Sequence, residues 1–193
     1  MKVQCLTVGE LGTNCYLAIC EKTNETVVID PADEADFISD KILQLKLKPK
    51  FVMATHAHLD HLMAAEEIRL NFQIPFLIHE QEVLPVKKWT RRLVLPPQKW
   101  QTVKDAEKIE FGRETLTVIH TPGHTPGAIC LYSERDAILF SDDLLFREGI
   151  GRADLEFSSA ADLGKSLKKI LSLPPKTLVY PGHGEAFFLK NRK

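Results

Sequence analysis

The segment from Met53 to Ala65, MATHAHLDHLMAA, constrains this chain more than any other part of its sequence, because it places three histidines and one aspartate within six positions. With 7 histidines in 193 residues, a hexamer of the form HxHxDH is expected by chance in roughly one such chain in two thousand. Imidazole and carboxylate groups are common ligands of zinc and iron in proteins. The pattern therefore predicts a metal site rather than a set of surface histidines.

Three further segments show the same arrangement, in which an apolar run predicted to be a strand ends at a turn that carries His or Asp. They are HTPGHTPG with His124, LFSDDLLF with Asp142 and Asp143, and VYPGHGEAF with His183. Because loops at strand ends often carry functional residues, we expect these side chains to gather at one rim of the fold. With the hexamer they supply five histidines and, if one of the neighbouring Asp142 and Asp143 is counted, two aspartates, which is too many for one tetrahedral ion. Two divalent ions are therefore predicted, each with nitrogen and carboxylate ligands and an open water position.

The order of apolar runs predicts an α/β fold. A composition of 44% hydrophobic and 26% charged residues in 193 positions suits one well-buried core. Helical periods are predicted from Asp33 to Leu47, from His61 to Phe72 and from Ala160 to Leu171. Strand-like runs are VQCLTV, NCYLAIC, TVVIDP and FVMAT in the first half, and TLTVIH, AICLYS, AILFS and TLVYP in the second. Two such halves predict a single domain over residues 1–193, a four-layer αββα sandwich of two mixed sheets packed face to face with helices outside.

The segment from Glu80 to Asp105 does not fit this pattern. It holds three prolines, both tryptophans and a cluster of four basic residues, without a sustained period. We therefore expect a long surface excursion, a kind of loop that is usually functional or mobile. The clustered basic residues are Lys87, Lys88, Arg91 and Arg92.

Charge, hydropathy and cysteine content narrow the setting. The formal net charge is −1, which predicts no general attraction to nucleic acid or to an anionic membrane. No apolar run approaches the length of a membrane span, and the N-terminus lacks the apolar region of a signal peptide. The four cysteines form no CxxC pair, as expected of buried free thiols in a reducing compartment. We expect a cytoplasmic protein with a small-molecule partner, no nucleic-acid or membrane partner, and an oligomeric state that the sequence does not specify.

Four ordered motifs, THAHLDH, HTPGHTPG, LFSDDLLFREGIGRADL and YPGHG, resemble those of the metallo-β-lactamase superfamily, and most closely its single-domain glyoxalase II-like branch of hydroxyacylglutathione hydrolase homologues. The resemblance covers essentially the whole chain. It implies two divalent ions, zinc with iron or manganese as alternatives, and attack by a metal-bound hydroxide. One ion would be held by His56, His58 and His124 and the other by Asp60, His61 and His183, with Asp143 bridging, and Asp60 and Asp143 would be the catalytic carboxylates. His79 and His120 match no ligand motif and are expected to be structural.

The chain departs from that branch at two places. The strand before the bridging aspartate usually ends in Gly-Asp, whereas Asp142 replaces the glycine here. Asp142 either points away from the site or accepts a hydrogen bond from a histidine ligand. The residues that hold glutathione are also largely absent, because the chain ends ten residues after His183 and has Arg152 and Asp154 where the branch has a lysine and a tyrosine. We expect no separate C-terminal glutathione-binding domain.

These features favour a dinuclear metal-dependent hydrolase that cleaves a small thioester, such as an acylated glutathione or a related thiol. A thiol of pKa about 8.5 leaves without a strong general acid, and the sequence offers none beyond the ligands. We expect Arg152, with Lys87, Trp89 and Arg91 of the predicted excursion, to bind the substrate and to favour an anionic thioester.

Four alternatives remain open. A persulfide dioxygenase-like enzyme would hold a single iron with His56, His124 and Asp143. A β-lactamase of this fold would normally be exported and carries Cys or Ser at the position of Asp143. A nuclease or phosphodiesterase would need a basic surface for nucleic acid, for which the four clustered basic residues are a small candidate. A metal-free binding module would be expected to have lost ligands, and no ligand is missing from this sequence.

Overall fold

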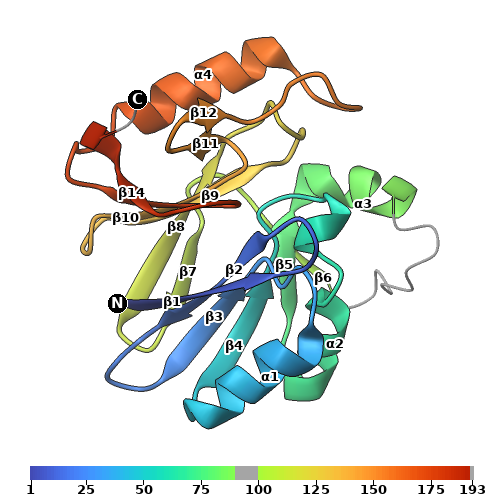
Figure 1. The fold of residues 1–193 in the computed structure, drawn as a ribbon, viewed down its shortest axis with the longest axis vertical. Helices are drawn as coiled ribbons and strands as arrows, with labels where there is room; N and C mark the ends of the chain where they lie inside the picture. The colour runs from blue at the N-terminus through green and yellow to red at the C-terminus, as the bar shows by residue number, and fades with distance from the viewer. Residues whose placement is uncertain (90–99, 192–193) are drawn as a thin grey trace.

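The strands form two mixed sheets that pack face to face, with helices on both outer faces (Figure 1). The computed structural model describes residues 1–89 and 100–191. Within those residues each of the two large sheets has six strands. The predicted four-layer αββα sandwich is therefore confirmed.

The first sheet joins an antiparallel meander to parallel strands. Its order is β1-β2-β3-β4-β5-β6, with β1 to β3 antiparallel and β3 to β6 parallel. The strands are β1 Lys2–Val8, β2 Thr13–Ile19, β3 Glu25–Ile29, β4 Lys48–Met53, β5 Phe76–His79 and β6 Trp100–Val103. Parallel neighbours require crossover connections, and helices supply them in this half of the chain. The helices are α1 Ala35–Gln44, α2 Ala65–Phe72 and α3 Val83–Trp89.

The second sheet is antiparallel except at one pair of strands. Its order is β14-β13-β10-β9-β8-β7, and β10 and β13 are the parallel pair. The strands are β7 Lys108–Phe111, β8 Glu114–His120, β9 Ile129–Ser133, β10 Ile138–Asp142, β13 Leu178–Pro181 and β14 Phe187–Phe188. A short pair, β11 Leu145–Phe146 with β12 Gly149–Ile150, lies between β10 and the helix α4, Ala160–Leu171. No helix among the described residues is long and apolar enough to cross a bilayer.

Strand β2 connects the layers because every one of its residues is buried. Alternate side chains of a strand point to opposite faces, so Tyr16 and Ala18 enter the core between the sheets, whereas Cys15 and Leu17 enter the core beneath α1 and α2. This two-sided burial explains why NCYLAIC reads as a continuous apolar run rather than an alternating one.

Helix α4 has the bounds that the sequence predicts, and its first turn shows why. The backbone N–H of Asp162 donates a hydrogen bond of 3.3 Å to the Ser159 side chain, which is an N-cap. Leu163 and Ile170 then fall on one face and pack against the second sheet. A capped start and a regular apolar stripe together define this helix.

The prediction of a surface excursion from Glu80 to Asp105 is wrong for the part that the structure describes. That part contains a 3₁₀ turn from Glu80 to Glu82, then α3, and then β6 at the edge of the first sheet. Pro85 lies in the first turn of α3, where a missing N–H breaks no helical hydrogen bond. Trp100 packs its ring against Phe76, with 5.6 Å between centroids. A four-residue edge strand is too short to show a period, so the pattern did not reveal it.

We predict that Leu17→Ala lowers the free energy of unfolding by about 2–5 kcal/mol, because removing a buried leucine side chain loses transfer energy and leaves a cavity. Leu17 is 0% exposed in β2, whereas Leu43 in α1 is 64% exposed. Urea unfolding of the metal-free protein measures the difference, with Leu43→Ala as the matched control. Equal losses in the two variants would contradict this description of the core.

Candidate metal centre

The candidate ligands meet at the rim where strands of both sheets end. After β4 the chain passes through His56 and His58 into a 3₁₀ turn, Leu59–His61, that carries Asp60 and His61. His124 follows β8, Asp143 follows β10 and His183 follows β13. The structure therefore brings all seven sequence-predicted ligands together, as two groups of three with Asp143 close to both.

The first group consists of three histidines. The Nδ1 atom of His58 lies 2.9 Å from the Nε2 atom of His56 and 2.9 Å from the Nε2 atom of His124. The nitrogens belong to segments 66 residues apart in the chain, so this convergence is a product of the fold. Three imidazole nitrogens within reach of one point match the histidine side of a metal site.

The second group contains one carboxylate and two histidines. The Oδ2 atom of Asp60 lies 3.6 Å from the Nε2 atom of His61 and 3.5 Å from the Nε2 atom of His183. Two ligand atoms on one tetrahedral zinc ion lie about 3.3–3.6 Å apart, because each bond measures about 2.0–2.2 Å. The spacing of this group is therefore that of atoms that share an ion.

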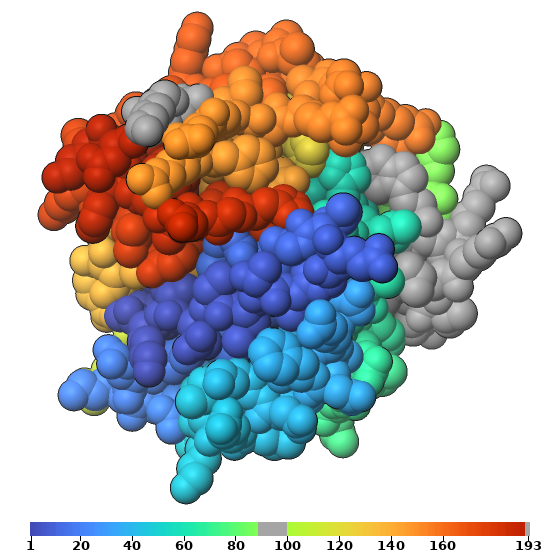
Figure 2. Space-filling view, viewed as in Figure 1, coloured from blue at the N-terminus to red at the C-terminus, as the bar shows by residue number. Residues whose placement is uncertain are grey.

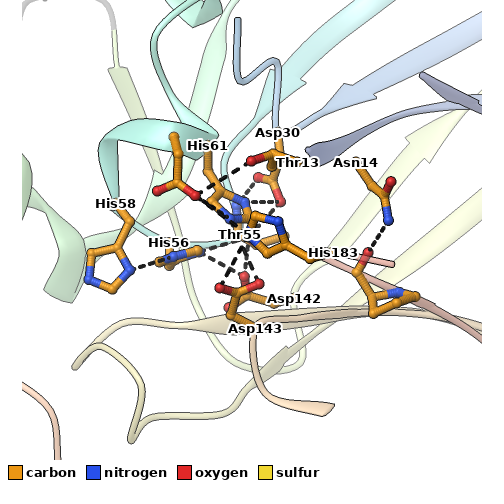
Figure 3. Close-up of polar contacts among 12 residues, drawn as sticks. Thr13, Asn14, Asp30, Thr55, His56, His58, His61, Asp142, Asp143 and His183 are labelled. Atoms are coloured by element: carbon orange, nitrogen blue, oxygen red, sulfur yellow. Dashed lines mark hydrogen bonds and ion pairs between the residues drawn. The ribbon is translucent and has the colours of Figure 1, made fainter. Parts of the chain in front are cut away.

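Asp143 lies between the two groups (Figure 3). Its Oδ2 atom is 3.7 Å from the Nε2 atom of His124 and 3.6 Å from that of His183. Its Oδ1 atom is 3.8 Å from the Nε2 atom of His61. One carboxylate thus faces ligands of both groups, which is the geometry of a bridge between two cations.

The chemistry of the buried atoms fits bound cations. Among the described residues, the buried atoms His61 Nε2 and Asp143 Oδ1 have no hydrogen-bond partner, and an unpartnered buried polar atom is costly unless something else binds it. The chain also leaves room for the carboxylate, since a Cβ atom at Gly182 would collide with Asp143 Oδ1. The residues present therefore suit a pair of divalent ions.

Four of the five candidate histidine ligands direct their Nδ1 atoms at acceptors outside the two groups, which leaves Nε2 facing the centre. The distances are 2.7 Å from His56 to Asp142, 3.2 Å from His61 to Asp30, 2.9 Å from His124 to the Arg152 carbonyl and 3.2 Å from His183 to the Leu11 carbonyl. Such contacts fix the tautomer and ring orientation of a histidine ligand. These contacts therefore orient the Nε2 atoms of four candidate ligands toward the centre.

The pKa values of the candidate histidine ligands differ between the two groups. Burial lowers the pKa of His56, and burial together with the charge of His124 lowers the pKa of His58 to about 4. Both imidazoles are then neutral near pH 7, as a ligand must be. Burial acts to lower the pKa of His61 as well, but the hydrogen bond that His61 donates to Asp30 and the charge of Asp30 outweigh burial and raise that pKa to about 10.

The sequence did not identify Asp30 and Thr55, which lie behind the ligands. Asp30 accepts hydrogen bonds from the backbone N–H and the hydroxyl of Thr55, both at 2.7 Å, and contacts His61. It follows β3 and has a positive φ of 49°. An aspartate at the end of a buried strand is the same signal that identified the other ligand segments, but TVVIDP was interpreted as a strand alone.

The loop that carries His183 is held by β2. Asn14 donates from its side-chain amide to the carbonyls of Pro181 and Gly184, at 3.1 and 2.8 Å, and the Tyr16 hydroxyl donates to Pro181 at 2.6 Å. The space-filling view shows the C-terminal segment lying against the N-terminal hairpin (Figure 2). Residues from opposite ends of the chain thus position one ligand.

A cavity of about 590 Å³ opens onto the centre. It is lined by His58, Asp60, His124 and Asp143 of the two groups and by Leu11, Leu59, Arg152, Leu155 and Glu156. A second cavity of about 480 Å³ shares Leu11, Leu59 and Asp60 with the first. Asp60 therefore lies where the two cavities meet, and both cavities have apolar and charged lining residues.

The residues predicted to bind substrate have different positions. Arg152 lines the cavity, and its guanidinium donates two hydrogen bonds of 2.9 Å to the carboxylate of Asp154. Lys87 is exposed on α3. Trp89 is the last residue of α3, and Arg91 lies outside the described residues.

His79 and His120, expected to be structural, belong to neither group. Their rings stack on each other with 4.1 Å between centroids. His79 Nδ1 accepts a hydrogen bond from the Gln81 backbone N–H, and His120 Nε2 lies 2.9 Å from the Pro126 carbonyl.

We predict that Asp143→Asn reduces the metal content from two ions per chain to one or fewer, because an amide lacks the charge that holds two cations close together. Elemental analysis of the purified variant measures this ratio. Asp40→Asn, which changes an exposed carboxylate on α1, is the control and should keep the full content. Full occupancy in Asp143→Asn would mean that this carboxylate does not bridge.

We predict that the metal-free protein loses thermal stability as the pH rises from about 7 to 10. The folded-state pKa of His61, about 10, exceeds the ordinary value of 6.5. The interaction of His61 with Asp30 therefore stabilises the fold fully below pH 6.5, and this contribution is lost as the pH rises through the folded-state value. Thermal unfolding of chelator-treated protein across this range measures the effect. Asp30→Asn should flatten the dependence, and identical profiles would refute the assignment.

The comparisons with known proteins agree with this geometry. Residues 8–183 match the family model described as the metallo-beta-lactamase superfamily. The chain is 32% identical to the probable metallo-hydrolase YqgX of Bacillus subtilis, over 95% of this chain and 90% of that protein. It is 29% identical to the hydroxyacylglutathione hydrolase GloC of Haemophilus influenzae, over 95% and 91%.

Two solved structures share the fold over nearly their whole length. The BLEG-1 B3 metallo-beta-lactamase superimposes with a TM-score of 0.86 at 31% identity, over 98% of this chain and 95% of that one. TTHA1623, solved in a di-iron-bound form, gives 0.85 at 33% identity, over 97% and 96%. The family match over most of the chain, these relatives and the two convergent ligand groups lead to one conclusion. The chain belongs to the metallo-beta-lactamase superfamily, whose members include metallo-hydrolases.

Proposed function

We propose that the protein is a dinuclear metal-dependent hydrolase that cleaves a small thioester. The observation that carries the proposal is the position of Asp143, which faces histidines of both ligand groups. The name of the GloC relative, a hydroxyacylglutathione hydrolase, supports the substrate class. Zinc is the proposed metal, and the di-iron form of TTHA1623 makes iron the first alternative to test.

Two bound cations would supply a water of lowered pKa and would polarise the carbonyl group under attack. The side chains of this protein would hold the two ions in place. Asp60 must stay ionised to serve as a ligand. Burial would raise its pKa, but the hydrogen bond from His183 and the charge of His61 together lower it. Thr13 donates a further hydrogen bond of 3.4 Å to the same carboxylate oxygen.

A thioester suits the shape of the site. Its acyl and thiol parts lie on opposite sides of the scissile bond, and the two cavities share Leu11, Leu59 and Asp60 while their other lining residues differ. Leu11 and Leu59 offer apolar surface to a bound acyl or alkyl group. The leaving thiolate needs no strong general acid, and Glu156, the one carboxylate of the larger cavity outside the ligand groups, is ion-paired with Lys88.

The second candidate is an enzyme with a single iron held by His56, His124 and Asp143. The second group, Asp60 with His61 and His183, argues for two ions, since its atoms are spaced for a metal and two of its members face Asp143. A β-lactamase is the third candidate because BLEG-1 bears that name.

Elemental analysis combined with activity assays separates these candidates. The purified protein should contain two metal ions per chain and should hydrolyse acyl-thiol esters, with activity lost on chelation and recovered on adding zinc. One iron per chain with oxygen consumption on a persulfide would replace the proposal by the dioxygenase. Hydrolysis of a β-lactam with inert thioesters would replace it by the lactamase. Full thioesterase activity without any metal would refute both the metal site and the mechanism.

We predict that Arg152→Ala raises the KM for an anionic thioester roughly tenfold while kcat changes little, because a binding contact is lost equally from ground and transition state. A glutathione thioester and a neutral thioester of similar size are compared, and the neutral one should be unaffected.

Asp154→Asn is the matched variant, because it removes the carboxylate that now accepts both guanidinium hydrogen bonds. It should lower the KM for the anionic thioester. Equal effects of Arg152→Ala on both substrates would mean that this arginine does not bind the substrate anion.

A further inference from the structure

Asp142 occupies a backbone position that glycine fills without strain. Its φ is +56°, at the irregularity where β10 pairs with β13. Glycine adopts this left-handed conformation freely and aspartate adopts it at some cost. A glycine would also avoid burying a charged group, yet the Asp142 residue is only 2% exposed. The backbone conformation therefore gives no reason for an aspartate at this position. The reason must lie in the contacts of its side chain.

The carboxylate of Asp142 contacts the ligand shell from behind (Figure 3). Its Oδ1 atom lies 2.7 Å from the Nδ1 atom of His56 and 2.7 Å from the hydroxyl oxygen of Thr55. Of the two alternatives that the sequence left open, the structure has the second, in which Asp142 faces a histidine ligand. This contact leaves the Nε2 atom of His56 directed at the first group.

The contacts continue to the second group. The Thr55 hydroxyl also lies 2.7 Å from the Oδ2 atom of Asp30, and that atom lies 3.2 Å from the Nδ1 atom of His61. An uninterrupted line of polar contacts therefore runs from His56 through Asp142, Thr55 and Asp30 to His61. Since His56 and His61 belong to different groups, this line of contacts connects a candidate ligand of one ion to a candidate ligand of the other.

We propose that Asp142 is a positioning residue that holds His56 in its metal-binding tautomer and, through Thr55, couples the orientation of His56 to that of His61. The inference rests on the proposed metal centre, but it concerns metal affinity and not the substrate. A carboxylate next to the Nδ1 atom of a histidine ligand favours the tautomer that leaves Nε2 free for the metal, and makes the imidazole a stronger ligand. The effect should appear as tighter metal binding.

The same carboxylate is unfavourable when no ion is bound. Among the described residues, the buried Oδ2 atom of Asp142 has no hydrogen-bond partner, and a buried polar atom without a partner is costly. A cation held by His56 would add a favourable charge close to this carboxylate. Asp142 is therefore expected to weaken the metal-free fold and to strengthen the metal-bound one, which a purely structural residue would not do.

Two measurements on the full chain test this proposal. Zinc affinity is measured by competition with a chromophoric chelator, and thermal stability is measured on the metal-free protein. Asp142→Gly should bind at least one zinc ion about 10–100-fold more weakly, with an unchanged or higher melting temperature in the metal-free form. Asp142→Asn keeps an acceptor for His56 without the charge and should fall between the glycine variant and the wild type.

Thr55 provides the matched pair of variants. Thr55→Ser keeps the hydroxyl and should retain wild-type zinc affinity, whereas Thr55→Val keeps the shape and loses the hydroxyl, and should weaken zinc binding. Equal affinity in Thr55→Val and Thr55→Ser would overturn the coupling through Thr55.

Two outcomes for Asp142→Gly would overturn the role of Asp142. The first is zinc affinity within about threefold of the wild type, well below the change expected for such a contact. The second is a fall in metal-free melting temperature that accompanies the loss of zinc. A wild-type protein that binds no zinc or iron would refute the proposed function itself, whereas normal wild-type binding with an unaffected Asp142→Gly variant would refute only this inference.

Discussion

A cluster of three aromatic rings between the sheets determines the geometry of the site. Tyr16 of β2, Phe140 of β10 and Tyr180 of β13 have ring centroids 5.3 to 5.5 Å from one another. The chain reaches Asp143 three residues after Phe140 and His183 three residues after Tyr180. Close packing leaves such rings little freedom to shift, so the rings hold β10 and β13, which lead to these two ligands, against β2 of the first sheet. The Tyr16 hydroxyl adds a direct hydrogen bond to the His183 segment.

Electrostatics at the rim is a balance between buried acids and the groups that neutralise them. Burial raises the pKa of Asp30, and burial likewise raises the pKa of Asp143. Both carboxyls nevertheless lie beside histidines, and both belong to an arrangement in which cations would supply most of the compensating charge. An ion that binds the native state alone would shift the folding equilibrium toward the folded protein.

The sequence predicted the parts of this protein that local patterns determine. The candidate ligands were identifiable because each follows an apolar run, and α4 was identifiable from its apolar period. Asp30 and Thr55 were missed because their roles depend on contacts between distant segments, such as Thr55 with Asp142. β6 was missed because four edge residues carry no period. Arg152 was correctly expected near the rim, but its pairing with Asp154 depends on the conformation of the loop.

One residue at the tip of the β1–β2 hairpin, Leu11, has two structural roles. Leu11 is 70% exposed and lines both cavities, while its carbonyl lies 3.2 Å from the Nδ1 atom of His183. A backbone shift that adapts this loop to a larger or smaller substrate would also move the acceptor of a metal ligand. During divergence of related enzymes, selection for a new substrate would therefore act on metal retention as well. Side-chain replacements at the tip that leave the loop length unchanged are the evolutionary route that avoids this conflict.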